Sequence, residues 1–419
     1  MAALAATESP EGLAPSRRIP HDVWAVSFTS LFSDWSYEML LPILPFFLSI
    51  DLGASPLIVG LVEGLAILAQ SVSQFISGPR LAHRTDRRRI GTAGYATTTV
   101  SHALIAAATA WPYAAALRIT AWTARGERQP IKKAILADAS RKVGAGRSFG
   151  LEQMFDSLGA VAGTVSAVAV VLTEGLSGFR TIFAISFVPG VVAVLLFYRL
   201  VWDRNPSVSS QLDAVPDATT PEFPRRFKWF LASVAVFGLA FFNILLGLLR
   251  VGSGLIGSGG SSAISGILVA LVAYLLYNLV YTGMSYPAGV LADRFPRIGL
   301  VAVGYLLFVP VDLLFVQTPS AVIAFLAFLI AGVQIGLSDV ALSTWISRAV
   351  GPGEVGRAFG WFGAIQGVSS LGASVLIGAL WTAYSASLAF SVSAILALAG
   401  TALLIPLAFD SRSSPAGEH

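Results

Sequence analysis

Apolar stretches of about 20 residues recur along the 419-residue chain, and short polar segments separate them. The hydrocarbon core of a bilayer is about 30 Å thick, so a membrane-spanning helix needs about 20 mostly apolar residues. The pattern predicts an all-α membrane protein with twelve transmembrane helices. The expected spans lie near 23–50, 57–78, 90–110, 113–134, 148–173, 180–201, 227–250, 265–291, 297–317, 319–348, 356–378 and 385–408.

The composition requires a large lipid-facing surface. Hydrophobic residues make up 55% of the chain and charged residues only 12%, whereas a soluble domain carries about 25% charged residues. The net charge is +4, but the basic residues form short clusters between apolar stretches, where membrane topology places them. We therefore expect the partners to be a lipid bilayer and a small molecule, with no nucleic acid.

The residues that usually carry covalent or metal chemistry are few. Cysteine is absent, which excludes disulfides, thiolate metal sites and a cysteine nucleophile. The four histidines are scattered without metal-ligand spacing, and no nucleophile–base pair or phosphate loop is visible. The sequence predicts no enzyme, no cofactor and no metal. The 26 phenylalanines are ordinary for membrane helices and do not by themselves indicate an aromatic binding site.

A polar segment divides the spans into six and six. It contains Pro206, Pro216, Pro221 and Pro224 and almost no apolar residues, which is typical of a flexible linker. We predict an N-terminal tail at 1–22, a six-helix bundle at 23–202, a linker at 203–226, a second six-helix bundle at 227–408 and a C-terminal tail at 409–419.

Lysine and arginine are distributed unequally between the two sides of the predicted membrane. The segments facing one side carry Arg80, Arg84, Arg87, Arg88, Arg89, Lys132, Lys133, Arg141, Lys142, Arg147, Arg225, Arg226, Lys228, Arg294, Arg297, Arg348 and Arg357. The other side carries only Arg180 and Arg250. Because loops rich in these residues remain cytoplasmic, we expect a multi-pass protein of the inner (plasma) membrane with both termini in the cytoplasm.

The two halves repeat a short motif. Between Gly78 and Arg89, after the second span, the chain reads Leu-Ala-His-Arg. Between Gly289 and Arg297, after the eighth, it reads Leu-Ala-Asp-Arg. Internal repeats are typical of transporters, whose substrate site lies between the repeats near the membrane midplane. The repeat predicts two pseudo-symmetric bundles.

These loops resemble the signature of the major facilitator superfamily, roughly G-x-L-a-D-R-x-x-R/K. The second copy matches, whereas the first has His83 where the acid is expected and its glycine offset by one residue. In the family this acid pairs with cations on neighbouring helix ends and helps to hold one conformation. The resemblance implies a conformational latch, with Asp86 as a substitute acid or with a weaker or pH-sensitive first half. Its residues are Gly78, His83, Arg84, Asp86, Gly289, Asp293, Arg294 and Arg297.

Three further segments look like a bacterial branch of that superfamily: 33–45, 60–64 and 147–163. The last is similar to the glycine-rich motif of efflux-type members, which carry proline where this chain has Thr164. The resemblance implies the MFS fold and a proton-coupled, efflux-like secondary transporter.

Acidic residues inside the spans are candidates for proton coupling. A charge at a helix centre costs about 2.5–3.5 kcal/mol on insertion scales, so it needs a partner or a function. Asp34 and Glu38 are four residues apart on one helical face. Two carboxylates this close at low dielectric do not both ionise easily, so one can load and release a proton. Glu63 and Asp156 extend the set. Static pairing with arginine and contact with a substrate cation remain alternatives.

Arg118, Trp122, Arg125 and Lys132 form one stripe along the fourth span. Lys132 fits an interfacial anchor, whereas Arg118 and Arg125 are deep and must either neutralise Asp34, Glu38 or Glu63 or contact an anionic substrate. Arg128, beside the stripe, and Glu152 are expected to form an inner gate. The predicted cavity set is Arg118, Trp122, Arg125, Asn243, Asn278, Tyr281, Gln334 and Gln366.

Together these features predict a monomeric secondary active transporter of a small organic solute that uses protons and alternates access between two bundles. The glycine-rich motif favours export. Two alternatives stay open: proton-coupled uptake of an organic anion, which the cationic stripe favours, and a non-transporting membrane sensor with the same fold.

Overall fold

The computed structural model describes residues 19–82, 86–140, 145–201, 223–242, 244–257, 263–294, 298–317, 320–350 and 355–410. Within these ranges the chain is almost entirely helical and contains no β-strand. The first half comprises α1 (His21–Leu40), α2 (Leu44–Phe46), the π-helical η1 (Phe47–Asp51), α3 (Pro56–Ala82), α4 (Arg87–Leu104), η2 (Ile105–Ala107), α5 (Trp111–Ser140), α6 (Ala145–Glu174), η3 (Gly175–Ser177), α7 (Gly178–Ile185) and α8 (Phe187–Leu200).

The second half comprises α9 (Arg225–Ala240), α10 (Ile244–Gly257), α11 (Ala263–Arg294), α12 (Ile298–Leu306), α13 (Phe308–Val316), α14 (Ala321–Ala349), α15 (Val355–Ala383), α16 (Ala386–Ala402) and α17 (Ile405–Asp410). The spans formed by α1–α2–η1, α7–α8, α9–α10, α12–α13 and α16–α17 are interrupted helices. In the first of them α1 ends at Leu40, shortly before Pro42, because proline lacks the N–H group that a helix interior needs.

By length and apolar character alone, eight stretches of the described chain qualify as membrane spans. One of them, Ser148–Leu200, contains both α6 and the α7–α8 crossing. The predicted spans at 23–50, 90–110 and 113–134 do not qualify, although α1–η1, α4–η2 and α5 occupy them. These three helices carry most of the buried polar side chains described below. The described ranges therefore form twelve crossings in two six-helix bundles, and the least apolar crossings belong to the first bundle.

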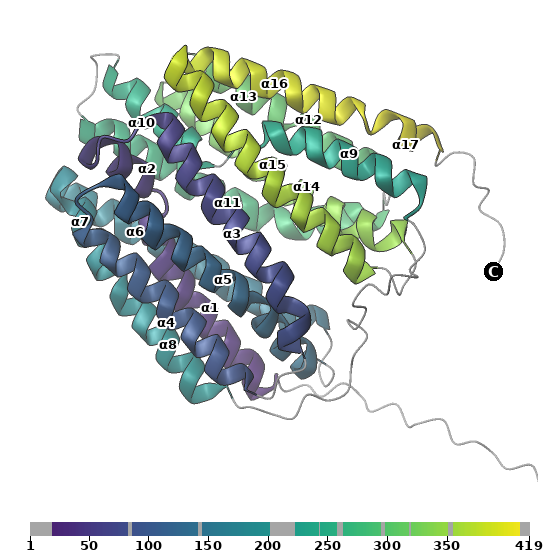
Figure 1. Ribbon diagram of the computed structural model, residues 1–419, viewed down its shortest axis with the longest axis horizontal. Helices are drawn as coiled ribbons and strands as arrows, with labels where there is room; N and C mark the ends of the chain where they lie inside the picture. The colour runs from purple at the N-terminus through teal and green to yellow at the C-terminus, as the bar shows by residue number, and fades with distance from the viewer. Residues whose placement is uncertain are drawn as a thin grey trace, which may run out of the picture.

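The two bundles lie side by side in Figure 1, the first at the lower left and the second at the upper right. They meet where α3 packs along α15 and α6 packs on α11. Large apolar side chains such as Phe75, Leu172 and Ile395 are more than 60% exposed on the outside. An apolar surface of this extent fits a lipid environment.

The bundles press together at one end of the molecule. We call the end at which α1 and α9 begin the basic end, because Arg87, Lys132 and Arg225 lie there, and the other end the opposite end. Near the opposite end, a β-carbon on Gly60 of α3 would fall on the carbonyl of Ser374 in α15. On the same α15, towards the basic end, a β-carbon on Gly363 would meet nothing within 4 Å. The bundles are thus in backbone contact near the opposite end, and α15 still touches α3 towards the basic end, where a β-carbon on Gly360 would lie 3.7 Å from the Phe75 ring.

Candidate functional site

The most buried charges of the first bundle form a closed pair. Arg118 on α5 donates from Nε to Oε1 of Glu63 at 2.8 Å and from Nη2 to Oε2 at 3.0 Å. Their side chains are 0% and 1% exposed. The guanidinium also lies 4.1 Å from the centroid of the Trp122 ring. Its Nη1 has no hydrogen-bond partner in the described part of the chain, but the two parallel bonds to Glu63 fix the orientation of the guanidinium.

Arg125, two turns further along α5, is held more loosely. Its Nη2 lies 3.9 Å from Oδ1 of Asp34 on α1, which is too long for a hydrogen bond. The guanidinium instead lies over the rings of Tyr37 and Trp122, at 4.5 and 4.8 Å from their centroids. Its Nη1 has no hydrogen-bond partner in the described part of the chain. Asp34 and Arg125 are therefore close enough to attract each other and loose enough to exchange partners.

A third cluster joins α1, α5 and α6 nearer the basic end. Lys132 donates to Oε1 of Glu152 at 2.6 Å, and Ser30 donates to the same oxygen at 2.8 Å. Asp156 lies 3.7 Å from the same ammonium group. The lysine expected to be an interfacial anchor is thus the partner of Glu152 and Asp156 on α6.

Arg128 differs from the expected gate arrangement. It lies over the Tyr95 ring of α4 at 3.9 Å, and no ion pair joins it to Glu152 within the described ranges. The physical reason is its position on α5: a residue beside the stripe points towards α4 rather than towards α6. The expected gate partner of Glu152 is therefore replaced by Lys132.

Glu38 lies at the interface between the bundles. The Tyr274 hydroxyl on α11 donates to its Oε2 at 2.8 Å, which links the two bundles. Among the described residues, no lysine or arginine nitrogen comes within 4.0 Å of this carboxyl group. Gly163 lets α6 approach closely, since a β-carbon there would lie 2.8 Å from Cβ of Glu38. Glu38 is thus enclosed by α1, α6 and α11 with a neutral hydroxyl as its partner.

Tyr274 begins a stack of three tyrosines on α11. The rings of Tyr274 and Tyr277 have centroids 5.7 Å apart and are tilted by 19°, and those of Tyr277 and Tyr281 are 6.4 Å apart at 18°. The Tyr281 hydroxyl donates to Oδ2 of Asp339 on α14 at 3.4 Å. We call these three residues the tyrosine stack. Of them, only Tyr281 was a sequence candidate. The spacing of three and four along an apolar helix is the signal that marks the other two.

A cavity of about 200 Å³ opens beside the tyrosine stack, lined mainly by the second bundle and by Ile67 of α3 from the first. Gln334 is its main polar residue, is 2% exposed, and donates to Ser338 at 3.0 Å. Most of the remaining wall is aromatic. The lining comprises Ile67, Phe241, Phe242, Ile244, Tyr277, Phe308, Val311, Phe315, Ala331, Gln334, Ile335 and Ser370.

The remaining cavity candidates fall in different places. Asn278 shares the helix face of Tyr274 and Tyr281; it is 8% exposed, and its Nδ2 has no hydrogen-bond partner within the described residues. Gln366 is exposed, one turn from Ser370 in the cavity wall. Asn243 lies outside the described residues.

The structure describes little of the predicted latch. Asp86 immediately precedes α4 and makes no side-chain cap bond to that helix. Gly78 lies in α3, and Gly289, Asp293 and Arg294 lie in α11, but their side chains are outside the description. His83, Arg84 and Arg297 lie outside the described residues altogether. The latch therefore remains a prediction.

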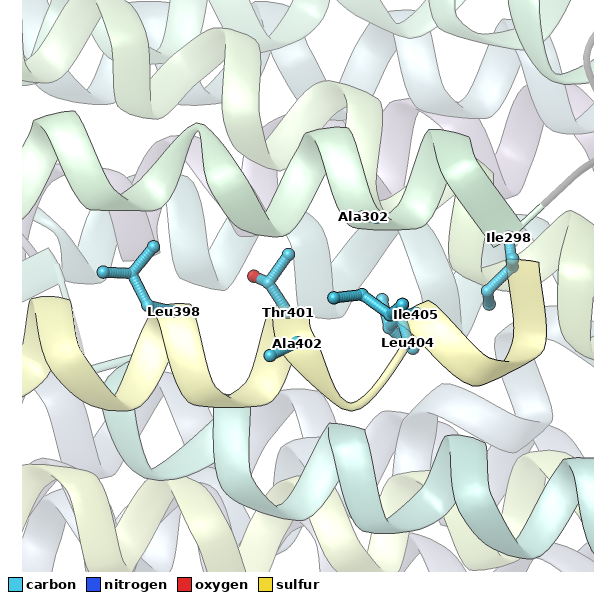
Figure 2. A pocket seen from close by; sticks show the side chains of 7 residues that line it. All are labelled: Ile298, Ala302, Leu398, Thr401, Ala402, Leu404 and Ile405. Atoms are coloured by element: carbon cyan, nitrogen blue, oxygen red, sulfur yellow. The ribbon is translucent and has the colours of Figure 1, made fainter. Parts of the chain in front are cut away.

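A second, larger cavity of about 300 Å³ lies between α12 and the pair α16–α17 (Figure 2). Its lining is Ile298, Ala302, Leu398, Thr401, Ala402, Leu404 and Ile405. The only hydroxyl there, on Thr401, already donates to the Ala397 carbonyl at 2.8 Å. This cavity has nothing with which to orient a polar solute, so the candidate site is the one around Glu38 and the tyrosine stack.

A family model now decides what kind of protein carries this site. Residues 26–276 match the model described as Major Facilitator Superfamily, which is more than half of the chain. The chain belongs to the Major Facilitator Superfamily. An uncharacterized MFS-type transporter of Methanocaldococcus jannaschii is 26% identical over 389 residues, covering 93% of this chain and 95% of that protein. An uncharacterized protein of Mycobacterium tuberculosis is 27% identical over 363 residues and 85% of each chain.

Solved MFS transporters share the fold at low sequence identity. A mutant of the nucleoside transporter NupG superposes with a TM-score of 0.77 at 12% identity, covering 92% of this chain and 99% of that one. The xylose transporter XylE from E. coli gives 0.70 at 12% identity, covering 96% and 100%. This MFS protein is thus a multi-pass membrane protein with a transporter fold, and its family indicates a transporter rather than an enzyme.

Replacing Arg125 by alanine is expected to lower stability by about 1–2 kcal/mol, because two contacts between the guanidinium and aromatic rings are lost. Arg125→Lys should lose less, since the ammonium group keeps the charge beside Asp34 but cannot stack as a plane. Thermal unfolding of the purified variants checks this order. An alanine variant as stable and as active as the parent would remove Arg125 from the site.

Proposed function

We propose that this MFS protein is a proton-coupled secondary transporter of a small organic solute, with Asp34, Glu38 and Asp156 as its proton-exchanging acids. The observation that carries the proposal is the hydrogen bond between Glu38 and Tyr274, because it joins one bundle to the other through a titratable group. If the bundles rock about the central site, α11 moves relative to α1 and this bond must break and re-form.

The state of the carboxyl group then depends on the conformation. An ionised Glu38 accepts the hydrogen bond from Tyr274, and separation of α1 from α11 removes that partner. Protonation offsets the loss, so proton binding favours one arrangement of the bundles over the other. A ligand shifts such an equilibrium only by its difference in affinity for the two states. Here the proton is the ligand, and its affinity changes with the distance between α1 and α11.

Asp34 and Asp156 extend this exchange towards the basic end. Arg125 lies 3.9 Å from Asp34, and Lys132 lies 3.7 Å from Asp156. Both distances are beyond hydrogen-bonding distance. Glu63, in contrast, is committed to Arg118, so we assign it a structural role. A proton arriving from the basic end meets Asp156 and Asp34 before it reaches Glu38. The three carboxyl groups therefore form a relay with a defined order.

We assign the basic end to the cytoplasm of the inner (plasma) membrane, on the distribution of lysine and arginine. The bundles are in backbone contact near the other end, where Gly60 meets Ser374, so we propose that the central site faces the cytoplasm in this conformation. A monomer suffices for this mechanism, because both bundles come from one chain. The glycine-rich segment that opens α6 favours export of the solute.

The proposal is tested in liposomes that contain the purified protein, a pH-sensitive dye and an imposed pH gradient. Solutes from a broad panel are added one at a time. At least one is expected to accelerate proton movement above the rate in protein-free vesicles. No acceleration across the whole panel would contradict the transporter and favour a membrane sensor.

Proton-coupled uptake of an organic anion is the second candidate, and one observation favours it. The Nη1 group of Arg125 has no partner among the described residues and lies beside Asp34. An anion could bind there if Asp34 were protonated. The same vesicles separate the candidates: an exporter moves solute against the proton flow, whereas an anion importer moves both in one direction.

A further inference from the structure

We infer that the solute is a small organic cation that carries an aromatic ring, bound with its ring in the aromatic cavity and its positive group beside the tyrosine stack. This inference rests on the proposed transport function and assigns its substrate class. Three independent features of the described site support it: the shape and lining of the cavity, the balance of charges, and a buried amide without a partner.

The cavity fits a ring rather than a large molecule. Ligand pockets for drug-sized molecules usually occupy about 300–1,000 Å³, whereas this cavity occupies about 200 Å³. Phe241, Phe242, Phe308 and Phe315 contribute to its walls. Aromatic rings favour offset or edge-to-face contacts with another ring. One aromatic ring of a solute is therefore the group that this space accommodates best.

Tyr277 connects the cavity to the charged part of the site. It lines the cavity and also stacks between Tyr274 and Tyr281. Beyond its two neighbours lie carboxyl groups, Glu38 at 2.8 Å from the Tyr274 hydroxyl and Asp339 at 3.4 Å from the Tyr281 hydroxyl. A solute with its ring in the cavity thus places its other end beside tyrosine rings that lead to acids. Ring faces and carboxylates both attract cations.

The site has more acids than cations. The described charged side chains around it are the carboxyl groups of Asp34, Glu38, Glu63, Glu152, Asp156 and Asp339 and the cationic groups of Arg118, Arg125, Arg128 and Lys132. All four cations lie on α5, where Glu63, Glu152 and aromatic rings engage them. Glu38 and Asp339 have only tyrosine hydroxyls within hydrogen-bonding distance among the described residues. A cation, supplied as a proton or as the solute, offsets this excess of negative charge.

The side chain of Asn278 is an independent indication that a ligand binds here. It lies on the face of α11 that carries Tyr274 and Tyr281, and it is more than nine-tenths buried. Its Nδ2 group makes no hydrogen bond within the described residues. A buried donor without a partner is costly, so an acceptor group on the solute would relieve that cost. We therefore expect the natural solute to carry a hydrogen-bond acceptor in addition to its ring and its charge.

The test compares three probes of nearly equal shape by calorimetric titration of the full-length protein in nanodiscs. Phenyltrimethylammonium carries the ring and the charge, tert-butylbenzene replaces the nitrogen by carbon and is neutral, and benzenesulfonate is an anion. The cation is expected to bind at least about tenfold more tightly than either of the others, a factor that lies between exposed and fully desolvated cation–ring interactions. Equal binding of the neutral probe, or tighter binding of the anion, would overturn the inference.

Variants locate the bound cation. Tyr277→Leu should weaken binding of phenyltrimethylammonium about tenfold, whereas Tyr277→Phe, which keeps the ring, should change it less than about threefold. Tyr384→Leu is the matched control, because Tyr384 is 74% exposed between α15 and α16. Asp339 is exposed, so the Asp339→Asn protein should fold even if Tyr277→Leu does not. It should bind phenyltrimethylammonium more weakly than the parent does and should bind benzenesulfonate no more weakly. The assignment would be contradicted if a folded Tyr277→Leu protein and the Asp339→Asn and Tyr277→Phe proteins all bound phenyltrimethylammonium as tightly as the parent does.

The inference and the proposed function can fail separately. If phenyltrimethylammonium does not bind while another solute drives proton movement in vesicles, the transporter stands and the cation assignment falls. If the cation binds with the expected variant pattern but neither it nor any other solute moves protons, the binding site stands and proton coupling falls.

Discussion

Replacing Arg118 by alanine is expected to destabilise the protein by about 3–5 kcal/mol, because removal of one partner of a buried ion pair leaves the other charge uncompensated. The partner is Glu63, which is 1% exposed and accepts both hydrogen bonds from Arg118. The measurement is thermal unfolding of the purified variant in detergent, followed by tryptophan fluorescence. The same loss of stability is expected for Glu63→Ala, which strands the arginine instead.

A double variant provides the matched control for this prediction. Glu63→Gln combined with Arg118→Met removes both charges together and keeps most of the volume, so its stability should lie close to that of the parent. An Arg118→Ala protein that unfolds at the parent temperature would mean that water reaches the pair, and the closed geometry at this position would then be wrong.

Glu38→Gln and Asp34→Asn are each expected to abolish solute accumulation driven by a pH gradient while leaving the protein folded. Both amides keep the shape of the side chain and its hydrogen bonding but cannot exchange a proton. Solute counterflow without a gradient should persist, because rocking of the bundles does not itself require proton release. Accumulation and counterflow are measured in the same vesicle preparation, with thermal unfolding as the check on folding.

Glu127→Gln is the control for that pair. Glu127 is an exposed acid of α5, and the ion pairs of the described site do not include it, so its amide variant should accumulate solute like the parent. If Glu38→Gln and Asp34→Asn both accumulate solute as well as Glu127→Gln does, the proton assignment fails.

The fold could be predicted from the chain because one physical requirement dominates it. Backbone polar groups in hydrocarbon must bond within their own helix, so a long apolar stretch has few alternatives. The criterion of about 20 mostly apolar residues also placed the three least apolar spans, α1–η1, α4–η2 and α5. The internal breaks, such as the one between α12 and α13, were not predicted, because a short interruption barely changes the apolar pattern.

The candidate site could be predicted only as a set of residues. Depth and helical face indicated that Arg118 and Arg125 would either neutralise acids of neighbouring helices or contact an anionic substrate. They did not indicate which acid each would meet, because that depends on how α1, α3 and α5 rotate against one another. Lys132 was assigned to the interface because its position near a helix end has that simpler explanation.

The second bundle was harder to interpret because its signals are apolar. Phenylalanine is common in membrane helices, so nothing in the chain distinguished Phe308 and Phe315, in the cavity wall, from residues that face lipid. The Tyr274–Glu38 hydrogen bond joins residues far apart in sequence. Only the packing of α11 against the first bundle brings them together, and no local sequence pattern predicts that packing.

The central claim is that the charged site borders a water-filled pathway, and one measurement tests it without knowledge of the solute. The chain has no cysteine, so a single introduced thiol is the only reactive one. A cysteine at Asp339, the exposed acid beside Tyr281, should react with a membrane-impermeant maleimide added from the basic end. A cysteine at Ser393, which is 0% exposed inside the second bundle, should not react. If the thiol at position 339 is as unreactive from both sides as the one at position 393, the charges are sealed in a dry interior and the carrier mechanism is contradicted.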